Sequence, residues 1–201
     1  MKLLHRPLLF MFLFVSSSLS LKAQYEEYES SVYRKWKVDG MIGYARPQGA
    51  GTKTGFLLNI EPKYNLTDQI STGLRIEGAA MARGYIDVTG VRFNGEAGLN
   101  LSFVPTVDYY FTQTLARPFL GTGAGVYNLV SAEVNAGNTT TIQIPSVTKF
   151  GFLLRGGVEI WHLRAAIEYN FIGKTGNINN NYLGLKIGFI IGGGPRMSEE
   201  E

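Results

Sequence analysis

The stretch GFLLNIEPKYNLTDQISTGLRIEGAAMA, residues 55–82, places charges of opposite sign two residues apart, with one apolar or ring residue between them. Glu61 and Lys63 share one side of its first half, and Arg75 and Glu77 share one side of its second half. Successive side chains of a β-strand point to opposite faces, so each half is predicted to be a strand with one charged and one apolar face. The intervening NLTDQ predicts a short turn, and the two strands therefore form a hairpin.

The same period of two recurs along the rest of the chain and predicts an all-β protein of eight strands. The predicted strands span residues 35–45, 55–64, 69–82, 96–111, 117–127, 149–160, 163–171 and 182–191. Their apolar faces hold 46 positions without a charge, although a chain with 17% charged residues would place about 8 there at random. The opposite faces carry seven bases and seven acids: Lys35, Lys37, Lys63, Arg75, Arg155, Arg164, Lys186, Asp39, Glu61, Glu77, Glu96, Asp108, Glu159 and Glu168.

Two architectures have strands with one apolar face, a soluble β-sandwich and a transmembrane β-barrel. The balance of charge and the many glycines on the charged faces favour a crowded, narrow lumen over a solvated surface. The aromatic residues also gather at the two ends of the apolar faces, as they do at the two interfaces of a bilayer. One predicted girdle is Trp36, Tyr64, Tyr109, Phe111 and Phe189, and the other is Tyr44, Phe56, Phe150, Phe152, Tyr169 and Phe171.

The connections between the predicted strands alternate between short and long. Short turns are predicted at residues 65–69, 112–116 and 161–162, and long loops at residues 83–95 and 128–148. Outer-membrane barrels have short periplasmic turns, long external loops and an even strand number that returns both termini to the periplasm. We therefore predict an eight-stranded antiparallel up-and-down transmembrane β-barrel. Pro62 and Pro105 fall inside its strands, where they predict bulges or bends, or else a misplaced strand boundary.

The N-terminus reads as a secretory signal peptide over residues 1–23, with Lys2 and Arg6 before a short apolar centre. Its eight apolar residues cannot span a bilayer, which needs about 20. We assign residues 24–34 to a periplasmic N-terminal segment, 35–192 to the barrel, and 193–201 to a periplasmic C-terminal tail. Secretion and the absence of Cys from all 201 residues indicate a periplasmic or outer-membrane protein of a Gram-negative bacterium.

Several motifs carry a resemblance to a known family. EPKYNLTDQISTGLRIEG, RPFLGTGAGVY and the closing YLGLKIGF resemble segments of the small eight-stranded outer-membrane β-barrels of the OmpA/OmpX type, especially the Bacteroidetes "outer membrane protein β-barrel domain" or "porin family" proteins. The resemblance covers residues 33–191. It implies an outer-membrane location and an assembly signal for the barrel-insertion machinery, with Tyr182, Gly184, Ile187 and Phe189 at its positions. The chain departs from the family by continuing through IIGGGPRMSEEE.

The predicted lumen indicates a closed barrel. An eight-stranded barrel is only just wide enough for its side chains to fill it, so opposite charges there should pair and plug it. Burying seven acids and seven bases is costly unless each is paired, so charge balance is a requirement of closure. We therefore expect no open pore, despite the porin label of some relatives.

Catalytic chemistry has little support. After residue 23 the chain has one His, His162, and no Cys, so we expect no catalytic residue, metal site or cofactor. Some outer-membrane barrels modify lipid A with a His and a Ser at the outer surface, but His162 lies in a predicted periplasmic turn without an adjacent Ser, as a structural turn residue does. The glycines of GTGAG, residues 121–125, lie mid-strand with no helix after them, so lumen packing is favoured over a phosphate loop.

Binding through the external loops is the remaining functional interpretation, with a lipid A-modifying enzyme or a narrow transporter of small hydrophobic compounds as the alternatives. Outside the strands the loops hold more bases than acids, namely Arg46, Lys53, Arg83, Arg92 and Lys174 against Asp87 and Glu133, with Lys149 at a strand mouth. Contact with outer-membrane lipid and the phosphates of lipopolysaccharide is one interpretation, and ordinary solvated loop charge is the other. Removing Lys2, Arg6 and Lys22 from 19 bases leaves 16 against 16 acids, so nucleic acid is not an expected partner. We expect a monomer.

Overall fold

The structure is a computed structural model that describes residues 33–49, 52–86, 92–130, 134–136, 140–142, 146–176 and 178–194. Its strands are β1 (Trp36–Pro47), β2 (Lys53–Asn65), β3 (Ile70–Ile86), β4 (Arg92–Tyr110), β5 (Ala116–Val130), β6 (Val134–Ala136), β7 (Thr140–Ile142), β8 (Val147–Ile160), β9 (Leu163–Phe171), β10 (Lys174–Thr175), β11 (Ile178–Asn179) and β12 (Tyr182–Gly192). The predicted signal peptide, residues 24–32 and residues 195–201 lie outside the described residues, so those assignments stay predictions.

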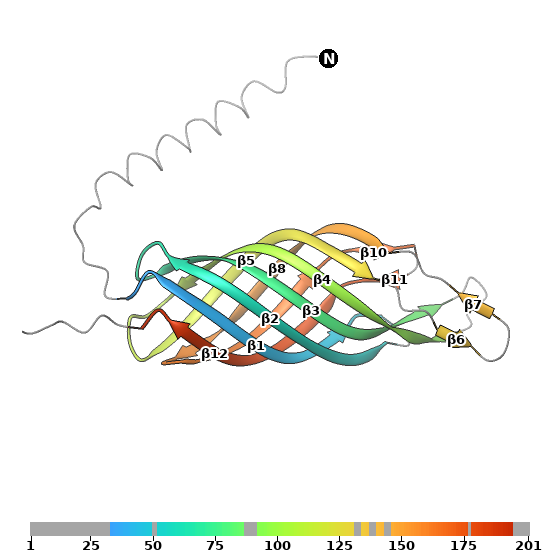
Figure 1. The fold of residues 1–201 in the computed structure, drawn as a ribbon, viewed down its shortest axis with the longest axis horizontal. Coiled ribbons are helices and arrows are strands. Elements are labelled where there is room, and N and C mark those ends of the chain that lie inside the picture. Colours follow the sequence, from blue (N-terminus) through green and yellow to red (C-terminus); the bar gives the residue numbers. More distant parts are fainter. Residues whose placement is uncertain are drawn as a thin grey trace, which may run out of the picture. The chain divides into compact units, whose positions relative to one another are not determined.

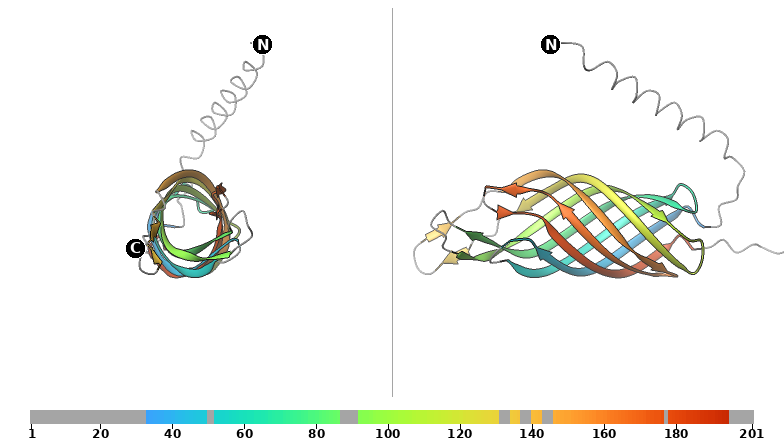
Figure 2. Two further views of the ribbon diagram at one scale, coloured as in Figure 1. Left: turned by 90° about the vertical axis from the view of Figure 1, so that its right-hand side faces the viewer. Right: turned by 180° about the vertical axis from the view of Figure 1, so that it is seen from behind.

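Eight of these strands form a closed antiparallel barrel in the order β1-β12-β9-β8-β5-β4-β3-β2, which confirms the predicted fold class. Barrel strands that follow one another along the chain are neighbours in the sheet, and β1 closes the ring by pairing with β12 (Figures 1 and 2). Two small hairpins, β6–β7 and β10–β11, stand apart from the barrel sheet at one of its ends. In the part of the chain that the structure describes, no helix is long and apolar enough to cross a membrane.

The short and long connections sort to opposite ends of the barrel, as predicted. Residues 66–69, 111–115 and 161–162 form the three short turns, at what we call the turn end. The last residues of β1, β3, β5 and β9 and the first residues of β2, β4, β8 and β12 lie at the opposite end, which we call the loop end (Figure 1). The turn at residues 161–162 is so tight that Trp161 takes a φ of 54°, in the left-handed region.

The predicted loops at residues 83–95 and 128–148 are too long. β3 and β4 remain paired as far as Arg83 with Glu96 and Ile86 with Arg92, and β5 continues to Val130. These strand ends project beyond the apolar belt, where pairing no longer requires an apolar face. Because a period-two search finds only the part of a strand that has one apolar face, it misses such extensions.

The predicted bulges at Pro62 and Pro105 are wrong. Pairing of β2 with β3 skips Pro62 between Ile60 and Lys63, and pairing of β4 with β5 skips Pro105, but the register is the same on both sides of each gap. Both prolines face outward. Each ring removes an N–H donor from one ladder without inserting an extra residue, so the strands lose local pairing and keep their phase.

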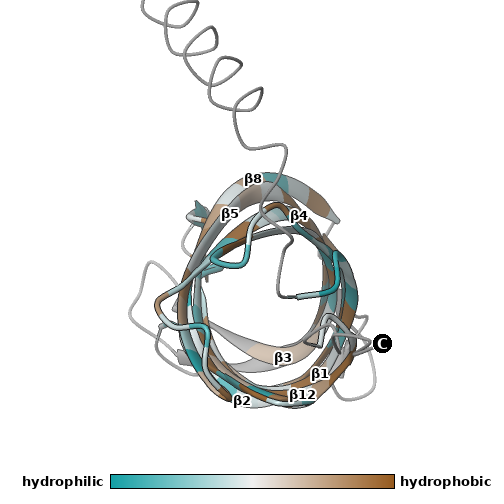
Figure 3. Ribbon diagram, turned by 90° about the vertical axis from the view of Figure 1, so that its left-hand side faces the viewer, coloured by the Kyte–Doolittle hydropathy of each residue, from teal (hydrophilic) through white to brown (hydrophobic). Residues whose placement is uncertain are grey.

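The barrel has the reverse of a soluble protein's polarity. Leu74, Leu101, Leu120, Ile167 and many other large apolar residues on the outer wall are exposed, while charged residues on the same strands are buried inside. Figure 3, seen from the turn end, shows hydrophilic and hydrophobic residues alternating along the strands. A wall of this kind requires lipid around it.

Exposed aromatic residues at both ends of the wall confirm the two predicted girdles. Trp36 and Tyr64 are in ring contact at the turn end, with centroids 5.0 Å apart, and Tyr44 and Phe56 are in contact at the loop end, 5.1 Å apart. Aromatic rings favour the two interfaces of a bilayer, so the girdles mark where the apolar belt begins and ends.

Candidate functional site: the barrel lumen

The lumen is lined by thirteen buried charged side chains among the residues that the structure describes. They are Lys37, Asp39, Glu61, Lys63, Arg75, Glu77, Asp108, Arg117, Arg155, Glu159, Arg164, Glu168 and Lys186, which are seven bases and six acids. Twelve of the fourteen predicted lumen charges are in this set. Of the other two, Lys35 is exposed just before β1 begins, so that prediction is wrong, and the side chain of Glu96 lies outside the description.

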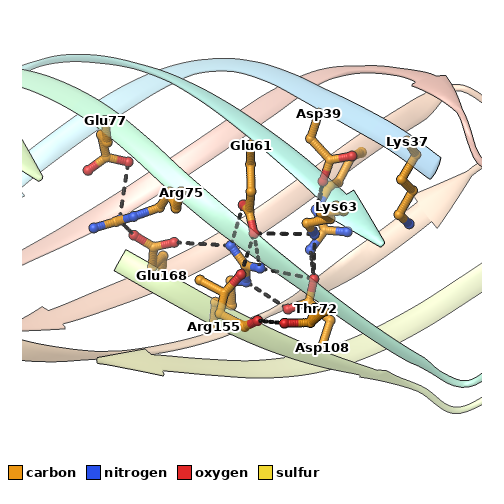
Figure 4. Close-up of polar contacts among 12 residues, drawn as sticks. Lys37, Asp39, Glu61, Lys63, Thr72, Arg75, Glu77, Asp108, Arg155 and Glu168 are labelled. Carbon is orange, nitrogen blue, oxygen red and sulfur yellow. Dashed lines mark hydrogen bonds and ion pairs between the residues drawn. The ribbon is translucent and has the colours of Figure 1, made fainter. Parts of the chain in front are cut away.

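The charged cluster in the middle of the lumen is built around Arg155 (Figure 4). Its Nη1 and Nη2 each donate to a different oxygen of Glu61 at 2.7 Å, and its Nε donates to Asp108 Oδ1 at 2.8 Å. Arg155 lies on β8 and Glu61 on β2, which are four places apart in the ring of eight strands. This fork-shaped ion pair therefore joins opposite walls of the barrel.

Two further bases complete this middle cluster. Lys63 Nζ lies 2.5 Å from Asp108 Oδ2 and 2.9 Å from Asp39 Oδ2. Arg164 Nη2 donates to Asp108 Oδ2 at 2.7 Å, and its Nε is 3.4 Å from Asp39. The Asp108 carboxylate thus meets three cations, which offsets the cost of burying it.

A second charged cluster lies closer to the loop end. Arg75 on β3 forms an ion pair with Glu168 on β9, again from opposite walls, and Lys186 pairs with both Glu77 and Glu168. The Tyr182 hydroxyl donates to Glu77 Oε1 at 2.5 Å. Figure 4 shows Glu77, Arg75 and Glu168 side by side, next to the Arg155 cluster.

The turn end of the lumen holds a third cluster, built on Glu159. Lys37 Nζ donates to its carboxylate at 2.9 Å, and the Tyr110 hydroxyl donates at 2.8 Å. Arg117 belongs to the same end of the lumen, with its guanidinium 3.9 Å from the Tyr33 ring centroid and 4.1 Å from the Tyr110 ring centroid. Arg117 is thus held between two aromatic faces, a stacking arrangement that suits a guanidinium.

The segment before β1 folds across this turn end. Tyr33 is buried and donates its hydroxyl to the Gln113 carbonyl at 2.9 Å, while Arg117 donates to the Asp68 carbonyl at 2.7 Å. The Arg34 amide donates to the Gly194 carbonyl at 3.0 Å. These contacts involve Tyr33, Arg34 and Gly194, just outside the predicted domain bounds of 35–192, and the bounds themselves stay a prediction.

Glycines leave the space that these ion pairs occupy. A Cβ on Gly121 would lie 1.9 Å from Asp108 Oδ1, and a Cβ on Gly73 would lie 2.7 Å from Lys63 Cγ. Gly121 lies in the middle of β5 and faces the lumen. The interpretation of GTGAG as lumen packing is confirmed at this position.

An apolar layer lies above the charges at the loop end. Its buried residues come from seven barrel strands and from the connection after β9: Ala45, Leu57, Ala79, Met81, Val104, Tyr127, Leu153, Ile172 and Tyr182. Ile172 belongs to that connection, where Asn181 Oδ1 accepts from the Ile172 amide at 2.7 Å. Buried side chains thus line the lumen from the Tyr33 segment up to this apolar layer.

No catalytic constellation accompanies His162. It lies exposed in the turn at residues 161–162, with Nδ1 3.1 Å from the Ile190 carbonyl oxygen. Among the described residues, no three His, Cys, Asp or Glu side chains are placed to hold a metal ion. The prediction that the protein has no catalytic, cofactor or metal residue stays a prediction.

Sequence reasoning missed Arg117 and the inward tyrosines. Arg117 has the lumen parity of β5 but precedes the run of glycines that drew attention, and Tyr110 and Tyr127 follow the lumen parity of their strands. Parity could have found all three. Nothing in the sequence indicates which residues each of them meets, since every partner lies on another strand, in a turn or before β1.

Comparison with known proteins gives one result, which concerns the fold. No family model matches the chain, and no curated protein sequence matches it. Neisserial surface protein A is 20% identical with a TM-score of 0.57, covering 80% of this chain and 98% of that one. The outer membrane protein OprG from Pseudomonas aeruginosa is 12% identical with a TM-score of 0.57, covering 81% and 98%. The chain has the fold of the small eight-stranded outer-membrane β-barrels.

Proposed function

We propose that this chain, with the fold of a small outer-membrane β-barrel, is an integral protein of the Gram-negative outer membrane with a closed lumen. It acts as a structural or surface-interaction protein through the loops at its loop end, which face outward while the turn end faces the periplasm. This orientation follows the rule that barrels of this kind have short periplasmic turns and longer external loops.

One observation carries the closed lumen: ion pairs join opposite walls of the barrel. Arg155 to Glu61 and Arg75 to Glu168 each connect strands four places apart in the ring. Such pairs place their side chains across the full width of the interior, where an eight-stranded barrel has room for little else. The stacked Arg117 and the apolar layer close the interior below and above them.

The charge at the loop end supports contact with outer-membrane lipid and with the phosphates of lipopolysaccharide. Arg46, Lys53 and Lys174 are exposed there, and Lys149 donates to the Lys174 carbonyl. Positive charge at this end would lie at the depth of the anionic headgroups of the outer leaflet. As in the sequence interpretation, we propose a monomer that is inserted by the barrel-insertion machinery.

No observation on the described residues specifically favours either alternative function. A lipid A-modifying enzyme would need its His at the outer surface, whereas His162 lies at the turn end. A transporter of small hydrophobic compounds would need a route through the lumen, which charged and apolar side chains occupy along its length. We therefore propose a non-enzymatic role.

Conductance tests the closed lumen. Purified protein in planar bilayers should show no large steady current. The double variant Arg75→Ala with Arg155→Ala, which truncates the two bases that pair with acids on the opposite wall, should show more current than wild type. The matched control removes side chains of the lipid-facing wall, Leu74→Ala with Leu154→Ala, and should stay closed. A stable nanosiemens-scale pore in most wild-type insertions would contradict the proposal.

Complementation tests the role of the loops. Cells lacking the protein would receive either the wild type or a variant in which a two-residue Asn-Gly turn replaces residues 131–146. We expect the variant to reach the outer membrane as a folded barrel but to lose the adhesion or aggregation phenotype of the wild type. Full restoration of every surface phenotype by the shortened chain would show that this loop does not carry the function.

A further inference from the structure

The outer wall of the barrel has an apolar hollow where β1 runs between β2 and β12. Five outward, exposed residues surround it: Ile42, Tyr44, Phe56, Leu185 and Ile187. Gly43, Leu57 and Lys186, which alternate with them and face the lumen, complete the lining. The hollow therefore opens toward the lipid side of the wall and lies just below the Tyr44 and Phe56 rings of the loop-end girdle.

Gly43 lies in the lining of the hollow, where β1 and β12 approach each other closely. It pairs with Lys186 on one side and Leu57 on the other, and a Cβ at this position would lie 2.0 Å from the Leu185 carbonyl oxygen. Only a residue without a side chain lets β1 and β12 approach this closely.

A cation stands directly above the hollow. Arg46 follows Tyr44 by two residues on the same face of β1, about 7 Å farther toward the loop end. The Arg46 side chain is exposed and makes no hydrogen bond or ion pair with another described residue, and exposed Lys53 begins the adjacent strand β2. Of the acids whose side chains the structure describes, all are buried in the lumen except Asp68, which lies at the turn end. Among the side chains that the structure describes, those at the rim above the hollow therefore carry only positive charge.

We propose that the hollow and Arg46 together form a seat for one molecule of lipid A. An acyl chain lies in the hollow between β2 and β12, and a phosphate of the glucosamine headgroup meets the Arg46 guanidinium. The apolar hollow alone would accept any lipid, but the cation at headgroup depth selects an anionic one. The inference rests on the proposed outer-membrane orientation, because the loop end then faces the leaflet that contains lipid A.

Lipid binding to the full chain tests the seat. Native mass spectrometry would follow binding of bisphosphorylated lipid A to purified protein in detergent, with the cold and heated gel mobility of each variant as the check of folding. Arg46→Gln should weaken binding about 5-fold, the effect of one basic residue near an anionic lipid surface. Lys35→Gln, which removes the same charge from an exposed position at the turn end, should bind as wild type does.

Filling the hollow gives an independent test. Leu185→Trp should occupy the acyl position and reduce lipid A binding, whereas Leu120→Trp, on the opposite wall in β5, should leave it unchanged. With lipid A stripped of both phosphates, wild type and Arg46→Gln should bind equally. Phosphatidylglycerol should compete only weakly.

Three results would overturn the seat. These are wild-type binding by folded Arg46→Gln and Leu185→Trp, equal competition by phosphatidylglycerol, and no retention of lipid A by wild type. Each can occur while the barrel remains closed in planar bilayers, so this inference can fail with the proposed function intact. Conversely, an open pore that still retains lipid A at this site would refute the closed lumen and leave the seat standing.

Discussion

Arg155→Met should destabilise the barrel strongly although it improves the overall charge balance of the lumen. The described lumen holds seven bases and six acids, so removing one base leaves equal numbers. Locally, however, the change removes both donors that Arg155 supplies to Glu61, whose carboxylate then keeps Thr106 at 2.5 Å and Lys63 at 3.7 Å. Asp108 keeps Lys63 at 2.5 Å. Glu61 is therefore the acid left without its main partner.

The expected cost is about 3–5 kcal/mol, as for breaking a buried ion pair from one side. Arg117→Met makes the same change in net charge and serves as the matched control. It removes a hydrogen bond to the Asp68 carbonyl, two ring contacts and a 3.5 Å ion pair with Glu159, but Glu159 keeps Lys37 at 2.9 Å and Arg164 at 3.2 Å. That loss should be about 1–2 kcal/mol, because no acid loses its principal partner.

Urea unfolding in lipid vesicles would give the free energy of unfolding for each variant. Adding Glu61→Gln to Arg155→Met should recover about 1–3 kcal/mol, because the unpaired charge is then gone. If Arg155→Met and Arg117→Met cost the same, or if Glu61→Gln recovers nothing, the cross-lumen pairing described here does not govern stability. Total charge or hydration of the lumen would then be the better explanation.

Other consequences of the same structure can be checked by simple changes. Leu74→Arg places a charge on the lipid side of β3, where Leu74 is 40% exposed, and should cost about 2–4 kcal/mol in vesicles, more than Leu74→Ala; equal stability of wild type and Leu74→Arg would reverse the assignment of faces. Gly121→Val should lower the free energy of unfolding by at least about 1–3 kcal/mol, because its side chain would displace Asp108. The control Gly78→Ala, which faces outward with Leu101 Cδ2 at 3.6 Å from the new Cβ, should be nearly neutral. A neutral Gly121→Val would show that the lumen has spare room. The folded chain should migrate differently before and after heating in detergent gels and should need lipid or detergent to fold; a soluble, protease-resistant chain after removal of residues 1–23, in plain buffer, would refute the membrane barrel.

The structure also shows where local patterns stop being informative. The strand boundaries at the turn end were predicted closely, because each turn interrupts the alternation within a few residues, as NLTDQ does between β2 and β3. At the loop end, β3 and β4 continue past the belt as a paired ribbon whose outer face no longer has to be apolar. The lumen assignment of Lys35 is wrong for a related reason. The odd-even alternation was extended one residue beyond the N-terminal end of β1, where the backbone is no longer a strand.

The amino-acid sequence alone predicts the number of barrel strands, the two faces of each strand, the aromatic girdles and the end of the barrel that carries the longer connections. All of these depend on the backbone alternation of single strands and on short turns, and both are local properties. Only the tertiary structure decided that Arg155 meets Glu61, that Arg75 meets Glu168 and that Arg117 stacks between Tyr33 and Tyr110. The two ion pairs join opposite walls of the barrel, so their meeting depends on ring closure and on the accumulated register of the strand pairs between them. The hollow beside Gly43 depends on the same closure, because β1 and β12 are far apart in the chain and become neighbours only when the ring is complete.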